Sequence, residues 1–146
     1  MEMFLSSIIA AIAAGMDLDN LVIDEDCGQL EAIAQGLDQY PVTFPCVLVS
    51  APECQFSNLA NEVVQRGKMK LSVRLAFDVY DDTRYGSGQE DEMITRMQHN
   101  KKLTSLINRK SFEGASGKMV RTFFQSYSMP HGVKVYETIY EATVSD

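Results

Sequence analysis

The sequence has no tryptophan, two histidines and three cysteines, and this scarcity limits the sites it can build. Cys27, Cys46 and Cys54 are odd in number and show no CxxC spacing, which indicates reduced thiols rather than a disulfide framework. His99 falls on the polar side of a predicted helix, and His131 falls in a predicted turn. Neither has a second His or Cys at a spacing typical of zinc ligands. We therefore expect no bound metal and no cofactor.

Positive charge is missing from the first part of the chain, where no Lys or Arg precedes Arg66. The net charge is −7 and the pI is about 4.8. Proteins that grip nucleic-acid phosphates need clustered Lys and Arg, so tight binding of DNA or RNA is not expected. A protein that DNA passes without being bound is still compatible with this negative net charge.

The apolar start MEMFLSSIIAAIAAG lacks the basic residues that precede the core of a signal peptide, and it is too short to span a bilayer. Its large apolar side chains recur at helical spacing, which predicts a core-facing amphipathic helix over 2–14 that stops at Gly15. At 146 residues with 45% hydrophobic residues, the chain is expected to form one domain, 1–146, with no membrane segment.

Prolines are few, and three of the four fall within YPVTFPCVLVSAP. Because proline cannot donate to a sheet ladder, Pro41, Pro45 and Pro52 predict a short strand at 44–50 with a fixed entry and exit. LVIDED at 21–26 is a second short strand candidate. The stretch 27–40 has a helical apolar face that its glycines weaken, so it stays ambiguous.

The clearest strand is KMKLSVRLAFDVYDD, in which apolar residues from Met69 to Val79 alternate with Lys70, Ser72, Arg74 and Asp78. This period of two predicts one buried face and one wet face. The preceding FSNLANEVVQRG is expected to supply a hairpin partner that turns near Arg66-Gly67.

A turn-rich loop at 81–89 contains Ser87 three residues before Glu90, a capping-box signature for a helix over 89–109. Strands are predicted at 119–129 and 134–144, joined by a turn at Pro130-His131-Gly132. The order of elements predicts an α+β fold, a mostly antiparallel β-sheet with two main helices packed on one face.

Candidate catalytic features each have an ordinary structural explanation. Asp24-Glu25-Asp26 and the pair Asp81-Asp82 lack the ligand spacing of a calcium loop and are interpreted as solvated turn carboxylates. The glycine-rich GSG and GASG segments follow no phosphate-binding pattern. Two other features favour assembly instead: aromatic residues in the closing strands, and the loop at 81–89. The aromatics have ordinary core packing as their alternative.

The stretch FPCVLVSAPECQFSNLANEVVQRGKMKLSVRLAFDVYDDT, with its "QRG" and "YDDT" turns, resembles the tail terminator (tail-completion, minor tail) proteins of long-tailed phages and prophages, especially those of Bacteroides-type bacteria. The leading helix, the helix after the loop and the strand VKVYETIYEATV follow the same order. The resemblance implies a non-enzymatic virion protein, located in the tail or neck and assembled in the bacterial cytoplasm.

What the resemblance implies in detail is a homo-oligomeric ring, usually a hexamer, that caps the tail tube, ends its growth and provides the head–tail joining surface. The implied partners are further copies of itself, the tail-tube protein and the head–tail connector, with DNA passing through the lumen without specific binding. The interface residues we predict lie on the long strand, the loop and the closing strands: Lys70, Arg74, Asp81, Asp82, Thr83, Arg84, Tyr85, Tyr127, Tyr136 and Tyr140.

Three alternatives stay open. The cluster Lys101, Lys102, Arg109 and Lys110 either faces an acidic neighbour or only complements the helix dipole. The second alternative is a neck or head-completion protein of similar fold. In a different class, the chain is a small α+β enzyme or ligand-binding protein that uses Cys54, His99 or His131, which requires a deep pocket with convergent polar groups. We predict a flat sheet and no such pocket.

Overall fold

The computed structural model describes residues 2–37, 42–57, 66–79 and 84–145. One six-stranded sheet has the order β1-β2-β4-β6-β5, and β3 also pairs with β4. All pairs are antiparallel except β1 with β2. The elements are α1 (Glu2–Gly15), β1 (Val22–Glu25), α2 (Gln29–Ala34), β2 (Cys46–Val49), β3 (Glu53–Ser57), β4 (Arg66–Asp78), α3 (Asp91–Ile107), β5 (Val120–Met129) and β6 (Val133–Ser145).

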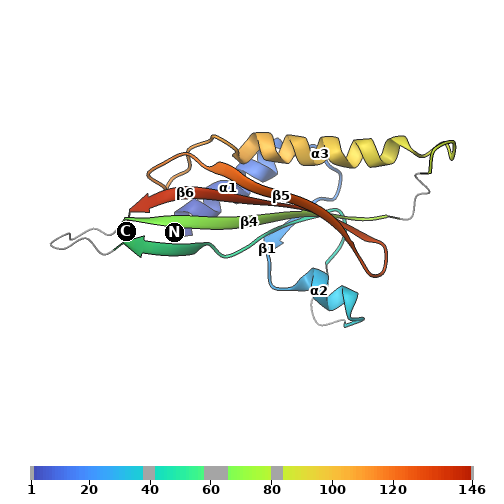
Figure 1. Ribbon diagram of the computed structural model, residues 1–146, viewed down its shortest axis with the longest axis horizontal. Helices are drawn as coiled ribbons and strands as arrows, with labels where there is room; N and C mark the ends of the chain where they lie inside the picture. Colours follow the sequence, from blue (N-terminus) through green and yellow to red (C-terminus); the bar gives the residue numbers. More distant parts are fainter. Residues whose placement is uncertain (1, 38–41, 58–65, 80–83, 146) are drawn as a thin grey trace.

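The two long helices, α1 and α3, lie side by side on one face of the sheet, and the short α2 lies on the opposite face (Figure 1). This confirms the predicted α+β class with two main helices on one face. None of the helices in the described ranges is long and apolar enough to cross a membrane. The ambiguous stretch 27–40 contains α2, which covers a second, smaller core.

The main core lies between the sheet and the two long helices. Phe4, Ile8 and Ile12 recur on one face of α1, and each is fully buried. They pack with Leu103 and Ile107 of α3. Gly15 ends α1 where a side chain would collide with Leu106, so the glycine also permits the close approach of the two helices.

Strand β4 runs through the middle of the sheet and pairs with β6 along its whole length. Its other edge pairs with β2 near one end and with β3 near the other. The alternation predicted from the sequence is confirmed, because Met69, Leu71, Val73 and Leu75 all face the main core.

Strand β2 is buried at all four residues, which explains why its sequence shows no alternation. Val47 and Val49 face the main core, whereas Cys46 and Leu48 face the second core beneath α2. The short strand predicted between the prolines is therefore confirmed, and the Phe44–Pro45 peptide bond before it is cis.

The predicted turn near Arg66-Gly67 is wrong, because both residues belong to β4. Gly67 sits between two strands, opposite Phe56 of β3 and Val144 of β6. A Cβ atom there would lie 2.7 Å from the carbonyl oxygen of Gln55. The glycine thus allows the close approach of two strands rather than a reversal of the chain.

The predicted capping-box pair is present, but it lies in the turn before the helix rather than in the first turn of the helix. The Glu90 carboxylate accepts hydrogen bonds from the Gly88 N–H at 2.8 Å and from the Ser87 hydroxyl at 3.4 Å. The helix itself begins at Asp91, with Glu90 as its N-cap. The predicted turn before β6 is confirmed, and His131 and Gly132 both have positive φ there.

Replacing Gly67 by alanine tests the close approach of β3 and β4. The added methyl group meets backbone, which cannot rotate away, so Gly67→Ala is expected to lower the free energy of unfolding by about 1–3 kcal/mol. Gly117→Ala is the matched control, because its Cβ would lie 3.7 Å from Thr143 in ordinary contact. Urea unfolding followed by circular dichroism measures both. Equal stability of the two variants would contradict the packing role of Gly67.

Candidate assembly surface

Arg74 lies on the face of β4 that carries α2, and its guanidinium is held by two carboxylates. Its Nε and Nη2 donate to Asp26 at 2.7 and 2.9 Å. Its Nη1 and Nη2 donate to Glu31 at 2.6 and 3.0 Å. Nη1 also lies 3.4 Å from the Tyr127 hydroxyl. The cluster therefore joins β4 to the turn after β1, to α2 and to β5.

The local sequence explains where the Asp26 carboxylate lies. Gly28 has a left-handed backbone with φ of 87°, and its N–H donates to Asp26 Oδ1 at 3.1 Å. Gln29 closes the same turn by donating to the Glu25 carbonyl at 2.9 Å. Asp26 is thereby aimed at Arg74, which contradicts its interpretation as a solvated turn carboxylate.

The electrostatics of the cluster follow from burial and pairing. Burial opposes the charge of Arg74, but the hydrogen bonds to Glu31, Asp26 and Tyr127 outweigh it, so the pKa of Arg74 is raised. The hydrogen bond from Arg74 lowers the pKa of Glu31. Arg74 is only 6% exposed, so its predicted place on an exposed interface is wrong. The predicted wet face of β4 is dry here because α2 covers it.

The predicted aromatic interface residues fall into two groups. Tyr136 and Tyr140 are fully buried in the main core, so they are packing residues of the single chain rather than contact residues on its surface. Tyr127 is half-buried beside the second core. The alternative of ordinary core packing, left open by the sequence, holds for the first two.

Lys70, Arg84 and Tyr85 are exposed as predicted. Lys70 lies on β4 and approaches Glu141 of β6 at 3.9 Å. Arg84 and Tyr85 lie in the loop before α3, where the Tyr85 side chain is 95% exposed. Asp81, Asp82 and Thr83 lie outside the described residues.

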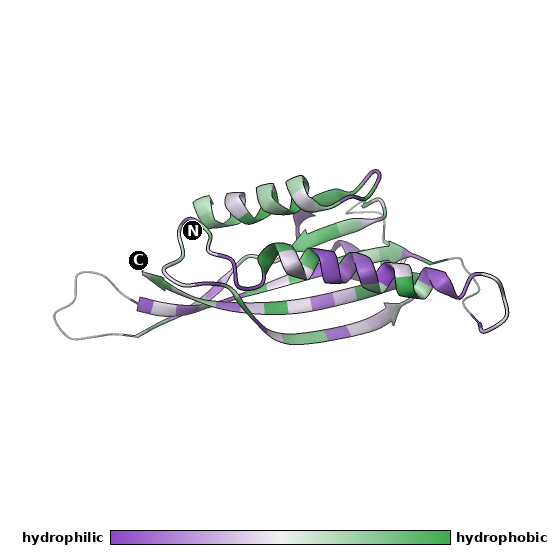
Figure 2. Cartoon of the chain, turned by 90° about the horizontal axis from the view of Figure 1, so that it is seen from above, coloured by the Kyte–Doolittle hydropathy of each residue, from purple (hydrophilic) through white to green (hydrophobic). Residues whose placement is uncertain are grey.

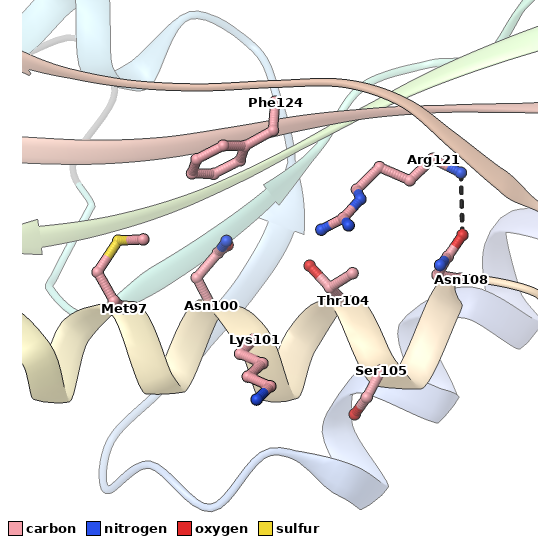
Figure 3. A pocket seen from close by; sticks show the side chains of 8 residues that line it. All are labelled: Met97, Asn100, Lys101, Thr104, Ser105, Asn108, Arg121 and Phe124. Atoms are coloured by element: carbon pink, nitrogen blue, oxygen red, sulfur yellow. Dashed lines mark hydrogen bonds between the residues drawn. The ribbon is translucent and has the colours of Figure 1, made fainter.

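An open groove of about 380 Å³ runs between α3 and the edge strand β5. Met97, Asn100 and Thr104 point from α3 toward β5, and Phe124 points back from the strand (Figure 3). The Arg121 N–H donates to the Asn108 side chain at 3.0 Å, which ties the end of the helix to the strand. The full lining comprises Met97, Asn100, Lys101, Thr104, Ser105, Asn108, Arg121 and Phe124.

Buried polar atoms lie beside this groove. Asn100 Oδ1 has no hydrogen-bond partner in the described part of the chain, whereas the Tyr140 hydroxyl lies next to the hydroxyls of Thr104 and Thr138. Burial raises the pKa of Tyr140, while the neighbouring Thr104 hydroxyl and the charge of Arg121 act against that shift. These atoms lie inside the packing of α3 against the sheet, so the open groove presents to a partner its exposed side chains, Lys101 and Arg121 among them, rather than these buried oxygens.

Apolar side chains surround the groove. Strand β5 ends the strand order and pairs only with β6 among the described strands. Viewed from above, β5 extends past α3 at the margin of the molecule (Figure 2). Large apolar residues are exposed on the helix and the strand, which is typical of protein contact surfaces. They are Met93, Ile94, Met97, Val120, Phe123 and Phe124.

The sequence did not predict this open groove, which differs from the deep pocket that an enzyme was expected to need. The helical spacing of Asn100 and Thr104 indicates a shared face, but nothing in the sequence shows that β5 faces it. Of the basic cluster noted in the sequence, Arg109 and Lys110 lie beyond the end of α3, and the last turn of this helix has no basic residue. The Arg109 N–H instead donates to the Met119 carbonyl at 2.7 Å, next to the start of β5.

The residues named for an enzyme lie elsewhere. Cys54, His99 and His131 are not among the lining of the groove. Burial raises the pKa of Cys46 to about 12, so this thiol stays protonated at neutral pH. Within the described ranges, no group of three or more His, Cys, Asp or Glu side chains is placed to hold a metal ion.

Comparison with known proteins gives a likeness in fold. No protein-family model matches the sequence, and no curated protein is similar to it. The structure is similar to a chain of the virion of the native gene transfer agent particle, with a TM-score of 0.55 and 5% identity. The match covers 95% of this chain and 84% of that chain, so it extends over the whole fold.

Removing the Arg74 charge tests the buried cluster. Arg74→Met leaves two carboxylates without their partner, so we expect the free energy of unfolding to fall by about 3 kcal/mol. Lys70→Met is the matched control on the same face of β4, because its ion pair is solvent-exposed and worth less than about 1 kcal/mol. Urea denaturation at neutral pH measures both. Similar losses in the two variants would show that the Arg74 cluster contributes little.

The same cluster predicts a pH dependence. The folded-state pKa of Glu31 is lowered below its usual 4.5, so the pairing stabilises the protein above that value and is lost as pH falls through the lowered pKa. The stability difference between the wild type and Arg74→Met should therefore shrink in acid. Denaturation midpoints measured from pH 7 to about pH 3 follow this difference. A gap that stays constant or widens in acid contradicts the pairing.

Proposed function

We propose that this chain is a structural protein of a phage or prophage virion, and that it acts as a tail terminator. In this role a homo-oligomeric ring, a hexamer in the usual arrangement, caps the last ring of the tail tube. The ring ends tube growth and presents the surface that joins the tail to the head connector. The chain would assemble in the bacterial cytoplasm and remain in the tail or neck of the particle.

The observation that carries this proposal is the likeness in fold to a virion chain over 95% of the sequence. At 5% identity the likeness shows the fold alone, and the step to a virion role is the proposal. The order of elements adds support, because the helix, the long alternating strand, the loop, the second helix and the closing hairpin match the order in tail terminators that the sequence resembles.

The surface also fits a protein that works by contact with other chains. A ten-residue edge strand with exposed apolar side chains on both faces is a liability for a solitary protein. Covering it in an assembly would remove that liability. The exposed Tyr85 in the loop before α3 provides a second contact point away from the groove.

We further propose that the role is non-enzymatic and that DNA passes through the ring without being gripped. A net charge of −7 gives no general attraction for phosphates. The basic residues around the groove are too few to form a continuous track for a duplex. Electrophoretic mobility of linear duplex DNA is expected to be unchanged by the protein at physiological ionic strength. A salt-dependent shift would contradict this part of the proposal.

The test of the main proposal combines this protein with the tail-tube protein and the portal-side connector from its own gene cluster. We expect rings at one end of each tube in negative-stain electron microscopy, and tubes that stop growing when the protein is added during assembly. Binding to the connector without binding to tubes favours a neck protein. A strict monomer under all conditions, including with tubes present, contradicts a role in the virion.

The genes beside this one provide an independent test, because tail genes lie in ordered clusters. A tail-tube gene next to it, followed by a very long reading frame rich in coiled coil, supports the tail terminator role. A portal or head-completion gene as the nearest neighbour, without a tube gene, supports the neck alternative. Metabolic genes on both sides would contradict both roles.

A further inference from the structure

Charge is separated along the order of strands. None of the 13 Lys and Arg residues precedes Arg66, so α1, β1, α2, β2 and β3 contain no basic side chain. Strand β1 stands at one end of the strand order and β5 at the other. The two ends of the sheet therefore differ in charge, which is a property of the folded chain that the net charge of −7 conceals.

The margin at β1 is acidic and exposed. Asp24 and Glu25 are exposed residues of the strand, and Asp17 and Asp19 are exposed in the segment that leads into it. No ion pair joins these four carboxylates to a cation in the described part of the chain. They are therefore available to a positive surface outside the chain.

The margin at β5 is the reverse. Lys101 and Arg121, both exposed, stand in the lining of the groove, which includes no acidic residue. Asn100 and Thr104 also line this groove, and their side-chain oxygens are buried. In Figure 3 the Arg121 side chain extends between the strand and the helix, toward these polar groups. The groove thus offers two positively charged hydrogen-bond donors to an incoming acidic edge.

We infer that the groove between α3 and β5 receives the acidic β1 margin of a second copy of this chain. Asp24 and Glu25 of one copy then lie against Lys101 and Arg121 of the next. The two surfaces are different and sit at opposite ends of the sheet, so the contact is head-to-tail and repeats from copy to copy. This inference rests on the proposed self-association and names the surfaces that carry it.

A second copy is favoured over other occupants because the chain carries both halves of the match. The groove is positive and lacks acidic lining, and the exposed carboxylates of Asp24 and Glu25 stand at the opposite end of the strand order. Charge complementarity of this kind raises the association rate and fixes the register of the contact.

The test uses two full-length variants with opposite charge reversals. Lys101→Glu with Arg121→Glu makes the groove acidic, and Asp24→Lys with Glu25→Lys makes the margin basic. Each variant alone places like charges together, so association should weaken by on the order of 100-fold. Mixed in equal amounts, the two variants should assemble again, because every contact then joins an acidic surface to a basic one.

Controls exclude misfolding and a general effect of net charge as causes of weaker association. All four side chains are exposed, so the thermal midpoint and circular dichroism of each variant should match the wild type. Arg66→Glu with Lys68→Glu changes the net charge by the same amount on the exposed face of β4, and it should leave association intact. Association is measured by analytical ultracentrifugation, with negative-stain microscopy to see rings.

The outcomes separate this inference from the proposed function. If each charge-reversed variant still forms rings like the wild type, or if the mixture of the two variants fails to assemble, the inference is overturned and the proposed ring is not. Loss of association in the Arg66 and Lys68 control alone would also overturn it, because the contact would then lie on the β4 face. A wild type that stays monomeric even with tail tubes contradicts the proposed function itself, and the inference with it.

Discussion

The sheet depends on a single constraint, which is that β4 must satisfy partners on both of its edges at once. It pairs with β6 over its whole length and with β2 and β3 on the other side. Its side chains must also suit two different faces, because α1 and α3 cover one and α2 covers part of the other. The sequence meets these demands with uninterrupted apolar alternation on one face and with Gly67 where three strands crowd together.

Arg74 shows how the two faces are joined. A strand pattern of apolar and polar residues predicts that its guanidinium faces water, and the structure instead buries it under α2 with two carboxylates. A buried charge is tolerated only when it is fully paired, and Asp26 in the turn before α2 together with Glu31 in α2 supplies that pairing. The ion pairs that offset the desolvation of Arg74 thus come from residues far from it in the sequence.

The class of fold, the two long helices and the two long closing strands were predictable from the sequence, since each rests on a long periodic pattern. The short elements were harder. A six-residue helix with flanking glycines gives little periodic signal, and QRG has the composition of a turn although its glycine lies inside a strand. The site was the least predictable part, because the groove joins Asn100 and Thr104 of a helix to Arg121 and Phe124 of a strand. Which helix face meets which strand depends on packing rather than on local pattern.

Several features concern what the single chain leaves unfinished. Its edge strand β5 is long and carries exposed apolar side chains, and Asn100 Oδ1 beneath α3 has no hydrogen-bond partner in the described part of the chain. Most native domains cover such features within the chain or blunt them. Here they lie together at one margin of the sheet, beside the exposed Lys101 and Arg121.

The opposite charge of the two margins contributes to each molecule a component of electric dipole along the strand order. Dipoles placed head to tail in an open filament add, and the moment grows with every subunit. Around a closed circle of equivalent subunits the same vectors sum to zero within the plane. Closure therefore lets each contact use the full attraction between its margins while the finished assembly presents no lateral dipole to its surroundings.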